Sequence, residues 1–128
     1  MSDRSPSSES SPLTFEAAQR RVDDWIQAVG VRYFGELTNL AQLTEEVGEL
    51  ARLLSRTYGE QSFKTSEQPE DVKAAIADEL ADIVFVTLCL SNQIGIDLTA
   101  AFERNLQKKT VRDADRHRSN RKLIDESP

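Results

Sequence analysis

The sequence predicts an all-α protein, and two observations favour this fold class. Apolar residues recur at intervals of three and four through the middle of the chain, which is the spacing of one face of a helix. Capping and helix-stopping residues separate these segments. The apolar run 83–90 could be a buried strand on composition alone, but helix-forming residues flank it without a turn signal. We therefore expect one helical domain in this chain of 128 residues.

The first two helices are expected on either side of a short connector. Thr14 is a suitable N-cap for the first helix, and Gly30 would end it. The apolar stripe of this helix consists of Phe15, Ala18, Val22, Ile26 and Val29. The second helix should begin near Thr38 and end near residues 58–59. Its apolar face, which we expect to pack in the core, consists of Leu40, Leu43, Val47, Leu50, Ala51 and Leu54.

Two further helices are expected after a polar loop. Pro69 suits the first turn of the third helix, with acidic residues 70–71 at its positive end and Gly95 as its stop. Asp97 would then cap the fourth helix. The apolar side of that helix consists of Leu98, Ala101, Phe102 and Leu106.

Composition divides the chain into a helical domain, 13–115, between two polar tails. Residues 1–12 hold six serines, two prolines and three charged residues, so we expect a disordered N-terminal tail. Residues 116–128 are mostly charged or polar and are expected to form a C-terminal tail.

The charge and cysteine content indicate a soluble cytoplasmic protein. A net charge of −6 argues against nucleic acid as a partner. Residues 1–12 lack the apolar core of a signal peptide, and no apolar run approaches the roughly 18 residues that cross a membrane. Cys89 is the single cysteine and lies in an apolar run, so we expect a buried thiol in a reducing compartment.

Two pairs of acids carry the functional signal. Glu46 and Glu49 lie three residues apart on the second helix, and Glu79 and Asp82 lie three apart on the third. Residues at this spacing share a helix face, so two packed helices would gather four carboxylates. Their mutual repulsion requires a compensating cation, and an all-oxygen ligand set suits Mg²⁺ or Mn²⁺. The alternatives are a solvated acidic face for the first pair and a buried ion pair with Arg or Lys for the second.

Other metal chemistry finds little support. The chain has no Cys-x-x-Cys motif, and its one histidine, His117, lies in the charged C-terminal tail.

Gly48 lies within the first acidic motif, and a mid-helix glycine costs roughly 1 kcal/mol relative to alanine. Close approach of a neighbouring helix or a ligand would explain it, as would simple tolerance.

The acidic motifs resemble the signature of the MazG family of all-α nucleoside triphosphate pyrophosphohydrolases. The resemblance rests on Glu45-Glu46-Val47-Gly48-Glu49 and on Glu79-Leu80-Ala81-Asp82, and it extends over roughly residues 15–112. It implies a four-helix MazG-like bundle completed by oligomerisation, as a homodimer or tetramer. It also implies Mg²⁺-dependent cleavage of an NTP or dNTP between the α- and β-phosphates, in nucleotide-pool sanitation.

The same resemblance assigns roles to the acids. Glu46, Glu49, Glu79 and Asp82 would hold the metal ion. Glu45 would orient or deprotonate the attacking water, and the alternative for it is a plain surface position. Glu46 is thus both a ligand and a candidate catalytic residue.

Substrate-binding residues are less sharply defined. Groups for the phosphates are expected after the second motif, at Asn105, Lys108 and Arg112, with Lys109 and Arg116 as alternatives and Lys64 as a further candidate. A platform for the base could come from Trp25, Tyr33, Phe34 or Phe63. Each cation could equally be a solvated surface residue, and Asn105 and the aromatic residues could be core residues.

Two other functions remain open at this point. One is a sibling reaction on dUTP, dCTP or phosphoribosyl-ATP, since the motif selects metal and phosphates rather than a base. The other is a non-catalytic helical module that binds a nucleotide or a protein. Retention of all four predicted ligands argues against the module.

Overall fold

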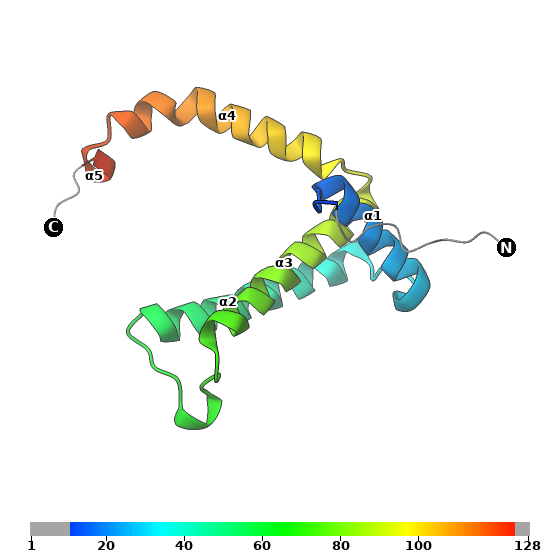
Figure 1. Ribbon diagram of the computed structural model, residues 1–128, viewed down its shortest axis with the longest axis horizontal. Helices are drawn as coiled ribbons and strands as arrows, with labels where there is room; N and C mark the ends of the chain where they lie inside the picture. The colour runs from blue at the N-terminus through cyan, green and yellow to red at the C-terminus, as the bar shows by residue number, and fades with distance from the viewer. Residues whose placement is uncertain (1–10, 125–128) are drawn as a thin grey trace.

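A computed structural model describes residues 11–124 (Figure 1). Most of the expected N-terminal tail lies outside these residues. The elements follow in the order α1 (Phe15–Trp25), a π-helical turn η1 (Ile26–Gly30), α2 (Glu36–Tyr58), a 3₁₀ turn η2 (Thr65–Glu67), α3 (Val72–Ile94), α4 (Leu98–Arg118) and α5 (Arg121–Ile124). No strand occurs within 11–124, so the all-α fold class is confirmed.

The centre of the fold is an antiparallel hairpin of α2 and α3, each 23 residues long. The two helices lie side by side along their length, and α1 packs on α3 where α2 begins and α3 ends (Figure 1). α4 starts against α1 and then runs back apart from the hairpin, without the extensive packing that joins α2 to α3. A single chain therefore forms a hairpin with a capping helix and a projecting arm.

The caps explain where most helices begin and end. Thr14 Oγ1 accepts a hydrogen bond from the Ala17 amide at 3.1 Å, and Asp97 Oδ1 accepts one from Ala100 at 3.2 Å. Gly95 ends α3 in the left-handed conformation, with φ of 76°, which costs glycine little. The expected caps of the first and fourth helices and the stop of the third are confirmed.

The start of α3 differs from the prediction that Pro69 lies in its first turn. Helix α3 begins at Val72, because Asp71 is the N-cap and its Oδ1 accepts a hydrogen bond from the Ala74 amide at 3.0 Å. A carboxylate satisfies an otherwise unpaired amide at the positive helix end, which Pro69 cannot do. α2 also starts earlier than expected, at Glu36.

The buried core is small and lies where α1 meets α3. Val22 and Ile26 of α1 and its π turn pack there with Leu88 and Cys89 of α3. Cys89 is 3% exposed, which confirms the buried thiol, and burial raises its pKa. This core holds α1 across one end of the hairpin.

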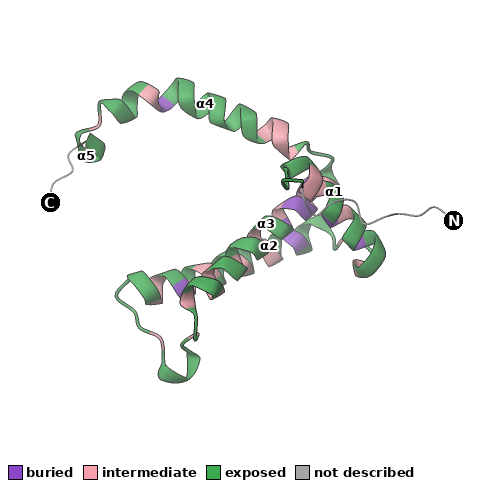
Figure 2. Cartoon of the chain, viewed as in Figure 1, coloured by how far each residue is buried: buried purple, intermediate pink, exposed green. Residues whose placement is uncertain are grey.

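The apolar face predicted for the second helix is mostly wrong, because four of its six residues are exposed. The more buried positions of α2 are spaced four and three residues apart, at Asn39, Leu43, Glu46, Leu50 and Leu53. Leu40 and Val47, in contrast, are 52% and 48% exposed. Helix α2 carries two adjacent heptad stripes, and within residues 11–124 its main neighbour, α3, covers only one of them. Figure 2 shows exposed residues along the outer side of the hairpin and along most of α4.

The C-terminal ends of the first and fourth helices differ from the sequence expectation. The last turn of the first helix widens into η1, which leaves Val29 exposed. Helix α4 crosses the expected boundary between residues 115 and 116 and continues to Arg118. Its final turns are polar on most sides, so composition alone did not distinguish them from a tail.

Val31 is expected to store backbone strain. Its φ is 72°, and the Arg32 amide donates to the Gly30 carbonyl at 2.8 Å, which closes a three-residue turn. A β-branched residue rarely adopts this conformation, and the Val31 side chain is exposed. We expect Val31→Gly to raise the free energy of unfolding by about 1 kcal/mol, measured by urea denaturation. The control Val29→Gly, in a helical turn, should lower it; a destabilised Val31→Gly would show that no strain is released.

Candidate metal centre

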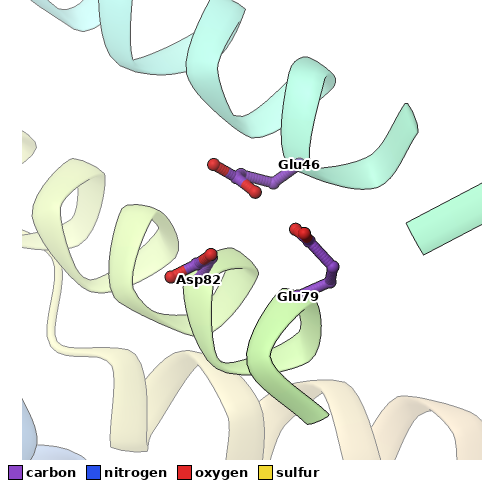
Figure 3. A group of neighbouring side chains, drawn as sticks. All are labelled: Glu46, Glu79 and Asp82. Atoms are coloured by element: carbon purple, nitrogen blue, oxygen red, sulfur yellow. The ribbon is translucent and has the colours of Figure 1, made fainter. Parts of the chain in front are cut away.

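Three carboxylates face one another across the middle of the hairpin (Figure 3). Glu46 comes from α2, and Glu79 and Asp82 come from successive turns of α3. One oxygen of each lies within 4.8 Å of the others. Figure 3 shows the Glu46 side chain extending toward α3 and the other two extending toward α2. The three-residue spacing on α3 and the packing of the two helices thus bring together three of the four acids that the sequence suggested as metal ligands.

Glu79 is the most perturbed member of this cluster. Its Oε2 atom is buried and has no hydrogen-bond donor. A hydrogen bond with the Glu46 carboxyl, then burial, then the charges of Glu46, Asp82 and Glu49 raise the pKa of Glu79 from 4.5 to about 7. Two carboxylates can share a hydrogen bond only when one is protonated. The neighbouring carboxylates and the burial thus make the Glu79 carboxyl hold a proton more readily than a free glutamate does.

No basic residue compensates these charges within residues 11–124. The ion pairs in that range join Arg52 to Glu49, and Arg112 and Arg116 to Asp113. The alternative of a buried ion pair at Glu79 and Asp82 is therefore not found. An oxygen-only cluster with an unpartnered buried oxygen fits a hard divalent cation.

The other acids of the first motif lie at the edge of the cluster. Glu49 is not among the three clustered residues, and its Oε2 lies 3.4 Å from Arg52 Nε. Its charge still contributes to the raised pKa of Glu79. Glu45 is exposed beside Glu46. A Cβ built on Gly48 would meet nothing within 4 Å, so no helix of this chain approaches it closely.

A cavity of about 190 Å³ lies next to the acids along the hairpin. Gln42 lines it one helical turn before Glu46, and Val86 lines it one turn after Asp82. Three of the predicted aromatic residues lie in its wall, namely Trp25, Tyr33 and Phe34. Phe63 is not among the residues that line it.

The three predicted aromatic residues in the cavity wall differ in how much of each side chain is available to a ligand. The Tyr33 hydroxyl donates to Asp23 Oδ1 at 2.7 Å and accepts from Asn92 Nδ2 at 3.0 Å. Burial first, and then the bond to Asp23, raises the pKa of Tyr33 to about 12. Trp25 meets Phe85 edge-on and is half exposed, as is Phe34. Trp25 and Phe34 thus retain accessible ring surface, whereas the Tyr33 hydroxyl is already paired.

The predicted phosphate-binding residues lie away from the acids in a single chain. Asn105, Lys108 and Arg112 are exposed on α4, which does not pack along the hairpin. Lys108 and Arg112 line a shallow depression of about 490 Å³ together with Arg104, Gln107 and Val111. Arg112 is held by Asp113, with Nη2 and Oδ2 2.9 Å apart.

The remaining candidates are also surface residues. Lys64 is exposed in the loop between α2 and α3, and Lys109 and Arg116 are exposed on α4. The structure therefore gathers three of the four predicted metal ligands and three aromatic residues, but none of the predicted cations.

Sequence reasoning missed the polar residues of the cavity. Asn39 is 5% exposed, and Gln42 is partly buried in the same wall. Asn39 lies seven residues before Glu46, which is two helical turns on the same face of α2. The position of a polar residue, Asn39, seven residues before a candidate metal ligand could have indicated from sequence that it belongs to the site.

The fold is a helical hairpin that presents clustered carboxylates beside a cavity with aromatic walls, and clustered carboxylates are suited to a divalent cation. Residues 34–117 match the MazG nucleotide pyrophosphohydrolase domain. The chain belongs to the MazG family, and the predicted class of enzyme, a nucleotide pyrophosphohydrolase, is confirmed.

Individual relatives agree with this assignment. The YpjD protein of Bacillus subtilis (strain 168), which is uncharacterized, is 38% identical over 106 residues, covering 83% of this chain and 92% of that protein. The crystal structure of a Bacillus-conserved MazG protein, a nucleotide pyrophosphohydrolase, has a TM-score of 0.65 at 36% identity and covers 81% of this chain and 97% of that one. The crystal structure of YpjD gives 0.65 at 37% identity and covers 77% and 96%.

Within residues 11–124, no helix combines the length and the apolar character that crossing a bilayer requires.

The raised pKa of Glu79 makes the stability of the metal-free protein depend on pH. The folded state holds this proton more tightly than the unfolded chain, so the stabilisation is complete below pH 4.5 and is lost as pH rises through about 7. Glu79→Gln keeps the shape and removes the charge. Without metal at pH 8 it should melt a few degrees above the wild type, and the difference should vanish below pH 4.5. Thermal melts from pH 4 to 9 measure this.

Asp78→Asn is the matched control for that experiment, because Asp78 is an exposed acid beside Glu79 in sequence but outside the cluster. It should follow the wild-type curve at every pH. Equal melting temperatures for Glu79→Gln and wild type at pH 8 would contradict the repulsion among the carboxylates.

Proposed function

We propose that this protein is a Mg²⁺-dependent nucleoside triphosphate pyrophosphohydrolase that acts in sanitation of the nucleotide pool. It would cleave an NTP or dNTP between the α- and β-phosphates and release a monophosphate and pyrophosphate. The observation that carries the proposal is the unpartnered, buried Oε2 of Glu79, within a carboxylate cluster that no basic residue of the described range 11–124 neutralises. Such a cluster is suited to a cation that in turn binds phosphate oxygens.

The proposed ligands are the clustered Glu46, Glu79 and Asp82, with Glu49 as the fourth. Glu49 would have to leave Arg52, and their exposed ion pair at 3.4 Å costs little to break. Mg²⁺ is the proposed ion and Mn²⁺ a substitute, because both prefer oxygen ligands. When bound, the ion would neutralise negative charge on the phosphates during their hydrolysis.

Glu45 is the proposed group that handles the proton of the attacking water. It is exposed and adjacent in sequence to Glu46, so it flanks the cluster without belonging to it. The water oxygen would form a bond to phosphorus as the bridging oxygen between the α- and β-phosphates departs with pyrophosphate. The Glu45 carboxylate would accept the water proton, and Glu46 would help to hold the reacting groups in place.

The cavity beside the acids is the proposed site for the base. Trp25 and Phe34 offer accessible ring surface for stacking, and Tyr33 forms a fixed part of the wall. The phosphates would extend along the hairpin toward the acids. Asn105, Lys108 and Arg112 of α4, with Lys64 of the loop, are proposed to bind them in the assembled oligomer. Lys109 and Arg116 are the alternatives on the same helix.

Activity should depend on the acids and on the metal. We expect Asp82→Ala and Glu49→Ala to lower kcat/KM for the preferred triphosphate by about 100-fold or more, because several kcal/mol of charge stabilisation would be lost. Pyrophosphate release from a panel of NTPs, dNTPs and phosphoribosyl-ATP, with Mg²⁺, with Mn²⁺ and with a chelator, measures this. Helical circular dichroism should be unchanged in both variants.

Asp78→Ala is the matched control, since it removes an acid outside the cluster from the same helix and should retain activity. Full activity in both ligand variants would remove Glu49 and Asp82 from the site. If no triphosphate is turned over with either metal, the chain is instead a non-catalytic module that binds a nucleotide or a protein.

The proposed assembly is a homodimer or tetramer that completes the helical bundle. Exposed apolar residues lie on α2, α3 and α4, at Leu40, Val47, Leu54, Leu80, Val84, Phe102 and Leu106. The α2 members recur with heptad spacing, which suits packing against another helix. α4 stands apart from the hairpin, so a second copy has access to that side. Large exposed apolar side chains of this kind support an interface between copies of the chain.

Val84→Lys tests the proposed assembly. Val84 is 52% exposed on α3, and a charge there should disrupt the interface and yield a single chain of 14.4 kDa. Light scattering coupled to gel filtration measures the mass, and the wild type should give a multiple of it. Val29→Lys, at an exposed valine on η1, is the control and should leave the assembly intact. A monomeric wild type at micromolar concentration would rule the assembly out.

A further inference from the structure

The amide group of Asn39 is held in one orientation at the wall of the cavity. Its Nδ2 donates to Gln93 Oε1 at 2.8 Å and to the Phe34 carbonyl at 3.4 Å. Gln93 Nε2 donates to the same carbonyl. A backbone carbonyl only accepts hydrogen bonds, so both amide nitrogens must face it. Rotating the Asn39 amide would lose both of its bonds and place oxygen against oxygen.

This arrangement leaves the amide oxygen of Asn39 as the atom available to a ligand. Both Nδ2 hydrogens are used, and Oδ1 accepts no hydrogen bond from residues 11–124. Within residues 11–124, Glu79 Oε2 is the one side-chain atom that is both fully buried and without a hydrogen-bond partner. Asn39 Oδ1, which also has no partner there, is therefore not fully buried. Asn39 therefore presents a fixed acceptor at the cavity that it lines.

The acceptor lies on the same face of α2 as the metal centre. Asn39 precedes Glu46 by seven residues, or about 10 Å along the helix axis. This separation suits a base in the cavity whose phosphates reach the acids. Resting on the proposed function, we propose that Asn39 selects substrates whose base carries an exocyclic amino group, cytosine or adenine, over those with a carbonyl there.

The discrimination follows from hydrogen-bond chemistry. Cytosine and adenine offer an amino donor at this edge, and uracil, thymine and guanine offer a carbonyl acceptor. An amino group would donate to Asn39 Oδ1. A carbonyl would face that oxygen with no hydrogen between them, and both would lose their bonds to water. The side chain of Gln42 makes no hydrogen bond within residues 11–124 and can turn either end of its amide to the base, so it does not discriminate.

A comparison of dCTP with dUTP tests the proposal directly, because the two substrates differ in this edge of the pyrimidine. We expect kcat/KM to be higher for dCTP by about tenfold or more, and dATP to be preferred to dGTP. Pyrophosphate release by the intact wild-type chain with Mg²⁺ measures both ratios. A dCTP to dUTP ratio of one or below would overturn the proposal.

Variants assign the preference to Asn39. Asn39→Ala should bring the dCTP to dUTP ratio close to one, mainly through loss of dCTP turnover. Gln42→Ala is the matched control from the same wall, and it should lower both rates while keeping the ratio. Gln93→Leu removes the partner that orients the Asn39 amide and should reduce the ratio without removing the acceptor. It serves also if Asn39→Ala folds poorly by circular dichroism.

The outcomes separate this inference from the proposed hydrolase activity. Turnover of no triphosphate would defeat both the activity and the base preference. Turnover of several triphosphates with no amino preference, or a preference that survives both Asn39→Ala and Gln93→Leu, would overturn the inference and leave the hydrolase intact.

Discussion

The repulsion among three carboxylates across the α2–α3 hairpin is the constraint on which the site depends. Glu46, Glu79 and Asp82 come within 4.8 Å of one another with no basic partner in residues 11–124. The packing of two 23-residue helices supplies the free energy that holds them together. The cost is visible at Glu79, whose carboxyl retains a proton to about pH 7. The fold thus maintains carboxylates that repel one another, and a bound cation would relieve this repulsion as it displaces the proton.

The same hairpin explains why the single chain leaves so much apolar surface uncovered. A helix with one apolar stripe needs one neighbour, but α2 has two stripes and α3 continues the second with Leu80 and Val84. The main buried cluster lies at one end, where α1 crosses the hairpin, and Leu53 is buried separately in the C-terminal half of α2. The acids therefore lie on a section of the hairpin that receives little support from the rest of the chain. A second copy on the exposed stripes would support that section and enclose the acids.

Much of this could be predicted from sequence, because helical periodicity and capping are local properties. Thr14, Gly95 and Asp97 mark helix ends through bonds to residues three or four positions away. Which stripe of α2 faces α3 is not local: Leu40 and Val47 are as apolar as the residues that pack there, and only the partner helix decides between them. The cavity was missed for the same reason, since its wall combines α1, the connector, α2 and α3.

On the proposed function, the heptad register of α2 would link recognition of the base to the chemistry at the acids. Asn39 and Glu46 occupy equivalent positions of that register, and the intervening helix is continuous from Glu36 to Tyr58. A straight helix transmits a displacement of one residue to the other with little loss. A base that fits the acceptor at Asn39 would therefore place its phosphates in a defined position at Glu46, and a base displaced from it would displace them too. Selectivity on this scaffold should consequently appear in the rate of hydrolysis as well as in binding.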